Sequence, residues 1–250
     1  GGVSYNGYMN EEFTKVWTNV YVPPAVGDEG QAIGAYQHAD YVLNGNKHIV
    51  STYAGKEYEW NPGIDEGWEW GYEELFWDHL DVKEIAQQIA DGKIIGWFQG
   101  KSESGNRALG NRSLFADARG PDIQDKVNKI KRRQEFRPFA PIVLEEFARD
   151  WFDMPGGKID SPYMSFTAKC LQPDVIPAVV HADGTSRVQT INRKQHPELY
   201  HAMRQWHAET GCPVVLNTSL NIKGQPIVNT EQEADEFAKH YKVKVHCRDD

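Results

Sequence analysis

Apolar residues recur every three or four positions in several stretches of the chain, a spacing that places them on one face of a helix. The clearest stretch carries Leu199, Met203 and Trp206. It begins at Pro197, a residue typical of a first helical turn, and ends at Gly211, typical of a helix end. Further helices are predicted from about residue 27 to 45, from Asp81 to Gly92, over 123–130, and after the capping box of Thr230 and Glu233. We expect these amphipathic helices to pack on a sheet.

Short apolar runs between these helices predict the strands of that sheet. Residues 94–98 form the clearest run, because they follow directly on the helix end at Gly92. The other predicted strands cover residues 20–22, 176–181, 186–191 and 213–216. The alternation of helices and strands indicates a mixed α/β architecture.

Two stretches of the N-terminal third differ in kind. Small residues, among them Gly30, Gly34 and Ala35, give the helix predicted at 27–45 a thin face suited to close packing. Residues 48–80 are rich in glycine, acidic and aromatic residues and have no clear periodicity. We therefore expect them to form a connector with local structure.

Composition narrows the class of protein. A chain of 250 residues is long enough for one large domain or two modest ones. No apolar run approaches the roughly 20 residues needed to cross a bilayer, so a soluble protein is predicted. Cys170, Cys212 and Cys247 lie far apart and include no C-x-x-C pair, which argues against a disulfide framework and a structural zinc site. A cytoplasmic location is the natural expectation.

Charge is unevenly distributed along the chain. The net charge is −9, which argues against nucleic acid as the main partner. Residues 101–137 nevertheless hold ten Lys or Arg against five Asp or Glu, a net +5, so the rest of the chain carries −14. Residues 57–84 form the acidic part, with ten acidic residues and one lysine.

The basic stretch begins with a glycine-rich loop. Gly100, Gly105 and Gly110 follow a predicted strand, with Arg107 between them and Arg112 after them. Isoleucine at position 95, where a phosphate loop of the Walker type needs glycine, excludes that motif. Glycines still let main-chain N–H groups approach an anion, and arginine forks bind phosphate oxygens. The pattern favours anion binding.

A second basic group lies where the helix predicted at 123–130 ends. Its members divide into helix-surface cations, expected to be merely solvated, and cations expected to bind ligand. A polar run directly after the predicted strand at 213–216 is placed to hold a ligand too, although such residues also favour turns. The solvated group is Lys126, Lys129 and Arg132; the ligand-binding group is Lys131, Arg133 and Arg137; the polar run is Asn217–Asn221.

Five longer motifs carry a resemblance to a known family. They are Gly96-Trp97-Phe98-Gln99-Gly100, Arg107-Ala108-Leu109-Gly110-Asn111-Arg112-Ser113, Phe136-Arg137-Pro138-Phe139-Ala140-Pro141, Asp183-Gly184-Thr185-Ser186-Arg187-Val188-Gln189-Thr190 and Leu216-Asn217-Thr218-Ser219. In this order they resemble the C-terminal half of the O-carbamoyltransferases that act in nodulation-factor and aminoglycoside-antibiotic synthesis. The resemblance covers nearly the whole chain. Asn106, where that family usually has proline, departs from it.

The resemblance implies a domain organisation. Residues 81–250 would form a YrdC-like carbamoyl-adenylate-forming domain, residues 51–80 an acidic, aromatic-rich connector, and residues 1–50 the end of an actin-like (ASKHA) carbamoyl-transfer domain. In that last part Gly1, Gly2, Gly27 and Gly30 would contact nucleotide, and Asp28 would ligate a divalent metal of the Fe²⁺ type. The nine histidines include no i, i+4 pair, so the missing ligands would come from an N-terminal half that this chain lacks. The chain is thus expected to be a fragment or one subunit of a split enzyme.

The resemblance also implies a reaction and its residues. Carbamoyl phosphate and ATP, the latter with Mg²⁺, would form carbamoyl-adenylate for transfer to the hydroxyl of a small-molecule acceptor. The implied catalytic residues are Arg107, Lys131, Arg133 and Arg137, and the implied substrate-binding and ATP-binding residues are Gly105, Arg112, Arg187, Asn217, Ser219 and Asn221. A K-x-R motif and an S-x-N motif supply Lys131 with Arg133 and Ser219 with Asn221.

Two other functions remain open at this point. The basic stretch could mark a module that binds double-stranded RNA, although the net charge of −9 speaks against it. An inactive scaffold subunit could instead dock a partner through Trp60, Trp68, Trp70 and Trp77, although linker aromatics more often pack between domains. His181, at the end of a predicted strand, is interpreted as structural.

Overall fold

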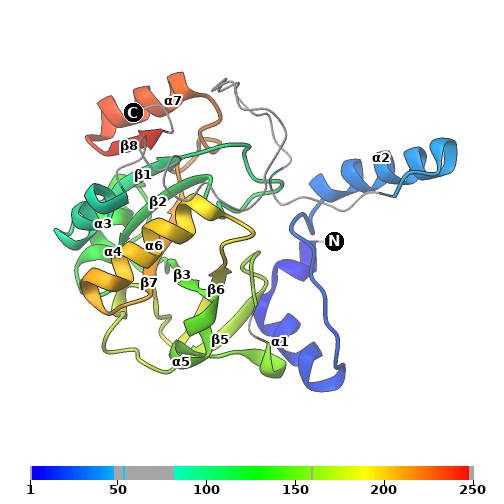
Figure 1. Ribbon diagram of the computed structural model, residues 1–250, viewed down its shortest axis with the longest axis horizontal. Helices are drawn as coiled ribbons and strands as arrows, with labels where there is room; N and C mark the ends of the chain where they lie inside the picture. The colour runs from blue at the N-terminus through cyan, green and yellow to red at the C-terminus, as the bar shows by residue number, and fades with distance from the viewer. Residues whose placement is uncertain (1, 48–52, 54–81, 159, 248–250) are drawn as a thin grey trace, which may run out of the picture.

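The computed structural model describes residues 2–47, 53, 82–158 and 160–247. Several features predicted above lie outside the described residues: Gly1, the helix cap Asp81, the four connector tryptophans and nearly all of the connector itself. The described residues form a mixed sheet of eight strands flanked by helices (Figure 1). The mixed α/β architecture predicted from the sequence is confirmed.

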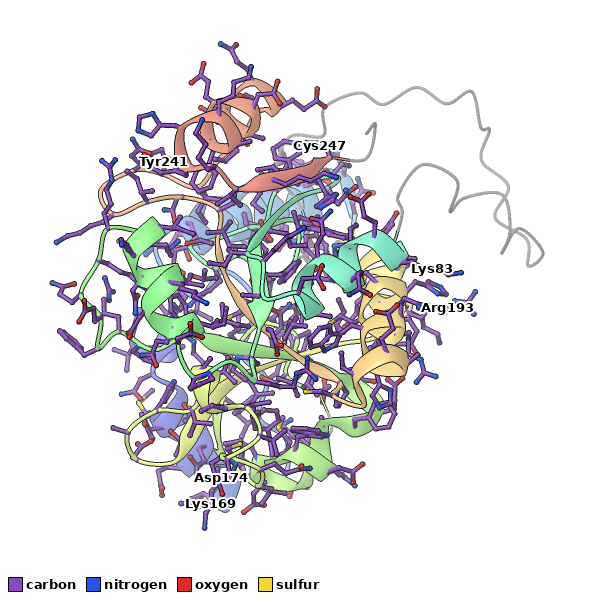
Figure 2. The ribbon with its side chains drawn as sticks, turned by 90° about the vertical axis from the view of Figure 1, so that its left-hand side faces the viewer. Lys83, Lys169, Asp174, Arg193, Tyr241 and Cys247 are labelled. Atoms are coloured by element: carbon purple, nitrogen blue, oxygen red, sulfur yellow. The ribbon has the colours of Figure 1, made fainter. Side chains whose placement is uncertain are left out.

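The strands run in the order β4-β5-β6-β3-β7-β2-β1-β8 across the sheet. Two neighbouring pairs, β1 with β8 and β3 with β6, are parallel, and the other pairs are antiparallel. The strands are β1 (Ile95–Phe98), β2 (Arg112–Asp117), β3 (Ala140–Leu144), β4 (Phe152–Asp153), β5 (Phe166–Cys170), β6 (Thr185–Ile191), β7 (Val214–Ser219) and β8 (Lys244–Cys247). In Figure 2, Tyr241 and Cys247 lie at one end of the molecule and Lys169 and Asp174 at the other, as this order requires.

Helices cover both faces of the sheet. The α-helices are α1 (Gly7–Val16), α2 (Glu29–Asn44), α3 (Val82–Ala90), α4 (Ile123–Ile130), α5 (Ala148–Trp151), α6 (Pro197–Thr210) and α7 (Glu231–Tyr241). Short 3₁₀ turns lie at η1 (Gly2–Tyr5), η2 (Glu145–Phe147), η3 (Pro155–Gly157) and η4 (Pro177–Val179). Every described helix is too short or too polar to span a membrane.

Alternation along the strands divides the core into layers. On one face Phe115 of β2 packs with Ile85 of α3 and Trp206 of α6. On the other face Ala116 of β2 packs with Val127 of α4, and α7 covers the end of the sheet next to β8. Several central strands are buried at every position, β2 among them, so the core extends on both sides of the sheet.

The predicted helices form with the predicted caps. Gly211 ends α6 in the left-handed region with φ of 71°, which glycine adopts without strain. Thr230 and Glu233 make the predicted capping box of α7, in which each side chain accepts from the other residue's main-chain N–H. The predicted strands at 94–98 and 186–191 are confirmed as β1 and β6.

Three strand predictions need correction. Residues 176–181 contain the 3₁₀ turn η4, because Pro177 lacks the N–H that a sheet ladder requires. Residues 20–22 form no strand, since no neighbouring strand pairs with them. The strand predicted at 213–216 continues as β7 to Ser219, so the polar run begins inside the strand instead of after it.

The N-terminal residues divide at α2. Helix α1 packs beside β5, where the buried Asn10 donates from Nδ2 to the Ser165 carbonyl at 2.7 Å, and Val22 and Val26 pack on Phe166. Helix α2, by contrast, extends away from the sheet in Figure 1 and buries none of its residues. Of the small residues predicted to pack closely, Gly34 has open space around it, whereas a Cβ at Gly30 would meet the Ala25 carbonyl at 2.0 Å. Within the described residues the predicted close packing is therefore found at the start of α2 and not further along it.

Candidate functional site

Lys131 lies directly after α4, where its side chain turns inward. It is 4% exposed. Its Nζ donates to the carbonyl and hydroxyl oxygens of Ser219, at 2.5 and 3.2 Å, and to the carbonyl and Oδ1 of Asn221, both at 2.9 Å. The K-x-R lysine and the S-x-N pair, 88 to 90 residues apart, thus meet at the end of β7.

Two opposing effects act on this ammonium group. Burial, together with the positive charges of Arg133 and Arg137, lowers the pKa of Lys131 to about 7. The four oxygens around Nζ favour the charged form. None of these four oxygens belongs to a carboxylate, so the partners of Nζ do not neutralise its positive charge.

Arg133 stands next to this lysine. Its Nε donates to Oδ1 of Asn128 at 2.5 Å, and its guanidinium stacks over Phe139 with Cζ 4.1 Å from the ring centroid. Burial and the charge of Arg137 lower the pKa of Arg133 to about 10. Arg137 itself is exposed. Its Nη2 also donates to the Pro138 carbonyl at 3.3 Å. The stacking fixes the guanidinium plane, and the N–H groups outside these two bonds are left for a ligand.

Arg187 of β6 and Arg107 of the glycine-rich loop approach from the other side. Burial lowers the pKa of Arg187 to about 9, and the nearby charges of Arg107 and Arg133 add to that effect. The buried Nε of Arg187 has no hydrogen-bond partner within the structure described. Burial also lowers the pKa of the half-buried Arg107. The charges of Arg107 and Arg133 thus both act on Arg187, although the two arginines come from different parts of the chain.

These five residues, Arg107, Lys131, Arg133, Arg137 and Arg187, are called the cation cluster below. Within the described ranges none of them forms an ion pair with a carboxylate. Four of the five are buried or half-buried, and gathering such positive charges without partners is unfavourable unless an anion completes them. The arrangement is therefore that of an anion site.

The glycine-rich loop is shaped by residues that do not point into the cluster. Oε1 of Glu103 accepts from the main-chain N–H groups of Leu109, Asn111 and Arg112, at 2.7, 2.8 and 3.2 Å. The fully buried Arg112 guanidinium donates to the carbonyls of Gln99, Gly100 and Asn111 at 2.7 to 2.9 Å. The main-chain N–H groups that were predicted to bind an anion are thus bound by Glu103. Arg112, predicted to bind substrate, instead holds the loop closed.

Asn217 fixes the same loop to the sheet. Its Nδ2 donates to Oε1 of Gln189 at 2.7 Å and to the Ala108 carbonyl at 3.2 Å, and Gln189 in turn donates to the Leu109 carbonyl at 2.7 Å. Both amides are buried. Asn217 therefore positions the residues beside Arg107, and only its unpartnered Oδ1 stays available.

Residues of the N-terminal segment lie close to this loop. Gly105 has φ of +112°, and a Cβ there would come within 3.4 Å of the Pro24 carbonyl and of Glu29. Gly27 donates its N–H to Glu29, and a Cβ at Gly30 would meet the Ala25 carbonyl at 2.0 Å. These two glycines thus serve local packing, and the exposed Gly2 has open space around it.

Asp28 has few neighbours. It is exposed and accepts a hydrogen bond from Gln31 at 3.2 Å. Within the described part of the chain, no three His, Cys, Asp or Glu side chains lie close enough to hold a metal. The residues described do not by themselves fit a metal.

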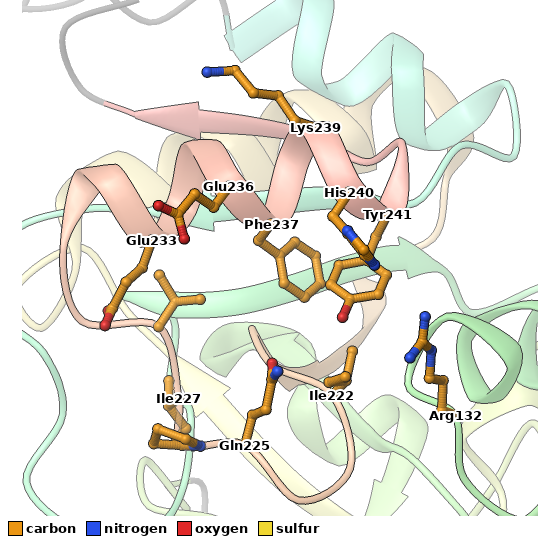
Figure 3. A pocket seen from close by; sticks show the side chains of 12 residues that line it. Arg132, Ile222, Gln225, Ile227, Glu233, Glu236, Phe237, Lys239, His240 and Tyr241 are labelled. Atoms are coloured by element: carbon orange, nitrogen blue, oxygen red, sulfur yellow. The ribbon is translucent and has the colours of Figure 1, made fainter.

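The cations expected to be solvated lie elsewhere. Lys126 pairs with Asp122 on the exposed surface of α4, and Lys129 is exposed. Arg132 has φ of 51°, and its Cζ lies 5.5 Å from the Tyr241 ring centroid. It lines a groove of about 860 Å³ along α7 (Figure 3). Exposure separates Lys131 and the half-buried Arg133 from these three cations, but Arg137, predicted to bind ligand, is as exposed as they are.

Comparison with known proteins identifies the family. The model named "Carbamoyltransferase C-terminus" matches residues 86–249. Nodulation protein NolO of Bradyrhizobium diazoefficiens is 35% identical over 94% of this chain, and 3'-hydroxymethylcephem-O-carbamoyltransferase of Amycolatopsis lactamdurans is 31% identical over 92%. This chain spans only 44% and 43% of those proteins.

A solved structure supports the fold. T. kodakarensis HypF matches with a TM-score of 0.50 at 19% identity, over 67% of this chain and 21% of HypF. That likeness agrees with the YrdC-like sheet expected for residues 81–250 and extends to the fold alone. With the family model covering most of the sequence, the chain belongs to the carbamoyltransferase family, of which it carries the C-terminal region.

Proposed function

We propose that this chain forms carbamoyl-adenylate from carbamoyl phosphate and ATP, as the activating part of an O-carbamoyltransferase. The single observation that carries the proposal is the cation cluster, half-buried and without carboxylate partners in the described residues. Both substrates are polyanions whose phosphates need such a surface. We assign carbamoyl as the transferred group because the chain belongs to the carbamoyltransferase family.

The proposed chemistry has three steps. Carbamoyl phosphate is hydrolysed to carbamate and phosphate. A carbamate oxygen then attacks the α-phosphorus of ATP, and the bond to the bridging oxygen breaks as its electron pair leaves with pyrophosphate. Finally an acceptor hydroxyl attacks the carbamoyl carbon, releasing AMP and a proton. The first step consumes one water molecule. Because carbamate decomposes in bulk water, it has to pass to the second step inside a site that is closed to bulk solvent.

The cluster residues divide this work by position. Arg107 and Arg187, on the loop and on β6, would bind the phosphate of carbamoyl phosphate. Arg133 and Arg137 would hold the phosphates of ATP, and ATP would enter with Mg²⁺. Catalysis would then consist of positioning and of stabilising charge on the phosphoryl oxygens.

Ser219 and Asn221 would orient the adenylate together with Lys131. In the unliganded arrangement the ammonium is shared among four oxygens of these two residues. A phosphate oxygen that replaced one of them would gain a charge-assisted hydrogen bond and raise the pKa of Lys131 again.

The transfer step is assigned to residues beyond this chain. The chain spans less than half the length of NolO and of the cephem carbamoyltransferase. Asp28 would be one ligand of a metal completed by histidines of an N-terminal half, which would also supply the acceptor site. The activating half-reaction is therefore the part that this chain can be tested for.

The test is isotope exchange between pyrophosphate and ATP. The wild-type chain should exchange label only when carbamoyl phosphate is present, since formation of the adenylate is reversible. Arg107→Ala should abolish exchange and leave the far-UV circular dichroism unchanged. Acetyl phosphate, which lacks the carbamoyl nitrogen, serves as the donor control.

Two results would contradict the proposal. One is the absence of exchange from a folded wild-type chain that binds ATP. The other is full exchange by the Arg107→Ala variant, which would remove the cluster from the reaction. Salt-sensitive binding of duplex RNA without exchange would favour a nucleic-acid module instead.

A further inference from the structure

Two segments far from Arg107 in sequence converge on it. Tyr5, at the end of η1, lies under the guanidinium, whose Cζ is 5.3 Å from the ring centroid. The Tyr5 hydroxyl donates to Oε1 of Glu29, the first residue of α2. Glu29 also accepts from the Gly27 N–H at 3.2 Å. The aromatic ring under Arg107 is thus held by a carboxylate that is itself held by the main chain.

The loop that carries Arg107 rests directly on this segment. Gly105 faces Glu29 and the Pro24 carbonyl so closely that a Cβ would touch both at 3.4 Å. Its φ of +112° lies where residues with a side chain are strained. Contact on both sides, at Gly105 and at Arg107, shows that the segment supports the loop over several residues.

Arg107 has need of such support. It is half-buried, and no carboxylate in the described part of the chain pairs with it. An unpaired arginine side chain has many rotamers, and fixing one of them costs conformational entropy on each binding event. An aromatic face orients a guanidinium and leaves its N–H edge free for an anion, which a carboxylate partner would not.

We propose that Tyr5 is a positioning residue for Arg107, with Glu29 as its support, so that the N-terminal segment completes one wall of the cation cluster. This positioning role is a statement about anion binding, which pyrophosphate alone can test. It rests on the proposed function only where ATP–pyrophosphate exchange is the readout. The pKa of Tyr5, raised to about 12 by burial and by Glu29, keeps the hydroxyl protonated and able to donate. A neutral phenol orients Arg107 through its ring and leaves the positive charge uncompensated for an anion.

The experiment is a double-mutant cycle on inorganic pyrophosphate binding, measured by calorimetry. Tyr5→Leu removes the ring and should weaken binding about threefold to tenfold, the range expected for a half-buried cation–π contact. Tyr5→Phe keeps the ring and should restore most of the affinity. In an Arg107→Ala background, Tyr5→Leu should change nothing further, because its effect passes through Arg107.

Tyr8 provides the matched control. It belongs to the same N-terminal segment but bonds to Asp183, at 2.5 Å, and to Thr185. Tyr8→Leu should leave pyrophosphate affinity within twofold of wild type. Melting temperatures of both leucine variants identify any general loosening of the segment.

Each outcome decides something. Equal weakening by Tyr5→Leu with and without Arg107, or no weakening at all, overturns the positioning role. If the cycle behaves as expected while the wild type shows no exchange, the positioning role stands and the proposed reaction falls. If the wild type binds no pyrophosphate, the cluster is no anion site and both proposals fall.

Discussion

The basic residues on either side of the end of α4 have the same charge and opposite environments. Lys126 and Lys129 lie on the helix surface, and the former pairs with Asp122 at 2.6 Å with more than half of each side chain exposed. Lys131, two residues beyond Lys129, is 4% exposed and surrounded by oxygens of the loop after β7. Exposed pairs contribute little to stability, whereas a buried cation without a carboxylate is retained for what it binds.

The difference arises where the helix ends. After Ile130 the backbone leaves the helical path, and Arg132 adopts a positive φ of 51°. The two neighbouring side chains then reach different residues, Lys131 contacting Ser219 and Arg132 contacting Tyr241. The backbone conformation at the helix end therefore decides which of these cations is buried beside Ser219 and which stays at the surface.

The largest effect is expected for Lys131→Ala against Lys129→Ala. Loss of Lys131 should lower the rate of ATP–pyrophosphate exchange on the order of 100-fold or more, as for other preorganised donors to a developing charge. Lys129→Ala should stay within twofold of wild type, because that side chain is exposed. Initial rates at saturating ATP give the comparison, and equal losses in the two variants would erase the distinction between the two groups.

A second contrast sets the unpaired Arg187 against the paired Arg119. Arg187→Met should weaken pyrophosphate binding about tenfold while leaving the melting temperature unchanged or higher, because an unpartnered buried charge is removed. Arg119 is held by both oxygens of Asp117 at 2.9 to 3.3 Å. Arg119→Met should cost about 1 kcal/mol of stability and leave binding intact. Calorimetry and urea denaturation test the pair, and a large loss of stability at Arg187 would mean that its charge is structural.

The pH dependence of exchange sharpens the role of Lys131. The ammonium form binds anions, and burial with Arg133 and Arg137 lowers its pKa to about 7. As pH rises through that pKa the charge is lost, so kcat/KM should fall, by about tenfold for each pH unit well above the midpoint. A bound anion raises the pKa, which should move the falling limb of kcat to higher pH. A flat kcat/KM profile up to pH 9 would exclude titration of Lys131.

The smallest effect is expected at a residue far from the cluster. Thr230→Ala removes the hydroxyl that caps α7, where it accepts from the Glu233 N–H at 3.1 Å. Stability should fall by about 1 kcal/mol. Exchange should remain at the wild-type rate, since α7 lines the groove that Arg132 shares and not the surroundings of Lys131 as far as the structure describes them. A loss of exchange would link that groove to the cluster.

Local rules explain most of what the sequence predicted of the fold. Helix α6 and helix α7 are marked by proline, glycine and capping residues within their own spans. Strand β2 carries no such local mark. Its six residues are all buried, although they include Arg112, Ser113 and Asp117. A central strand covered on both faces shows no alternation, so periodicity could not indicate it.

The site depended on contacts that no local rule provides. Loop glycines and arginines pointed to an anion, but the meeting of Lys131 with Ser219 and Asn221 spans about ninety residues and came only from the resemblance. Glu103 and Tyr5 were missed for the same reason. An acidic residue alone in a basic loop was the one available signal for Glu103.

The packing of α1 has a practical consequence for how this protein is shortened. The boundary predicted at residue 81 invites expression of residues 82–250 alone. Such a polypeptide would lose the hydrogen bond that Asn10 donates to the Ser165 carbonyl. It would also expose Phe166, which Val22 and Val26 cover in the full chain. It would also lose Tyr5 from beneath Arg107. A truncated protein without activity would therefore say nothing against the reaction, and the N-terminal thirty residues belong in any minimal version.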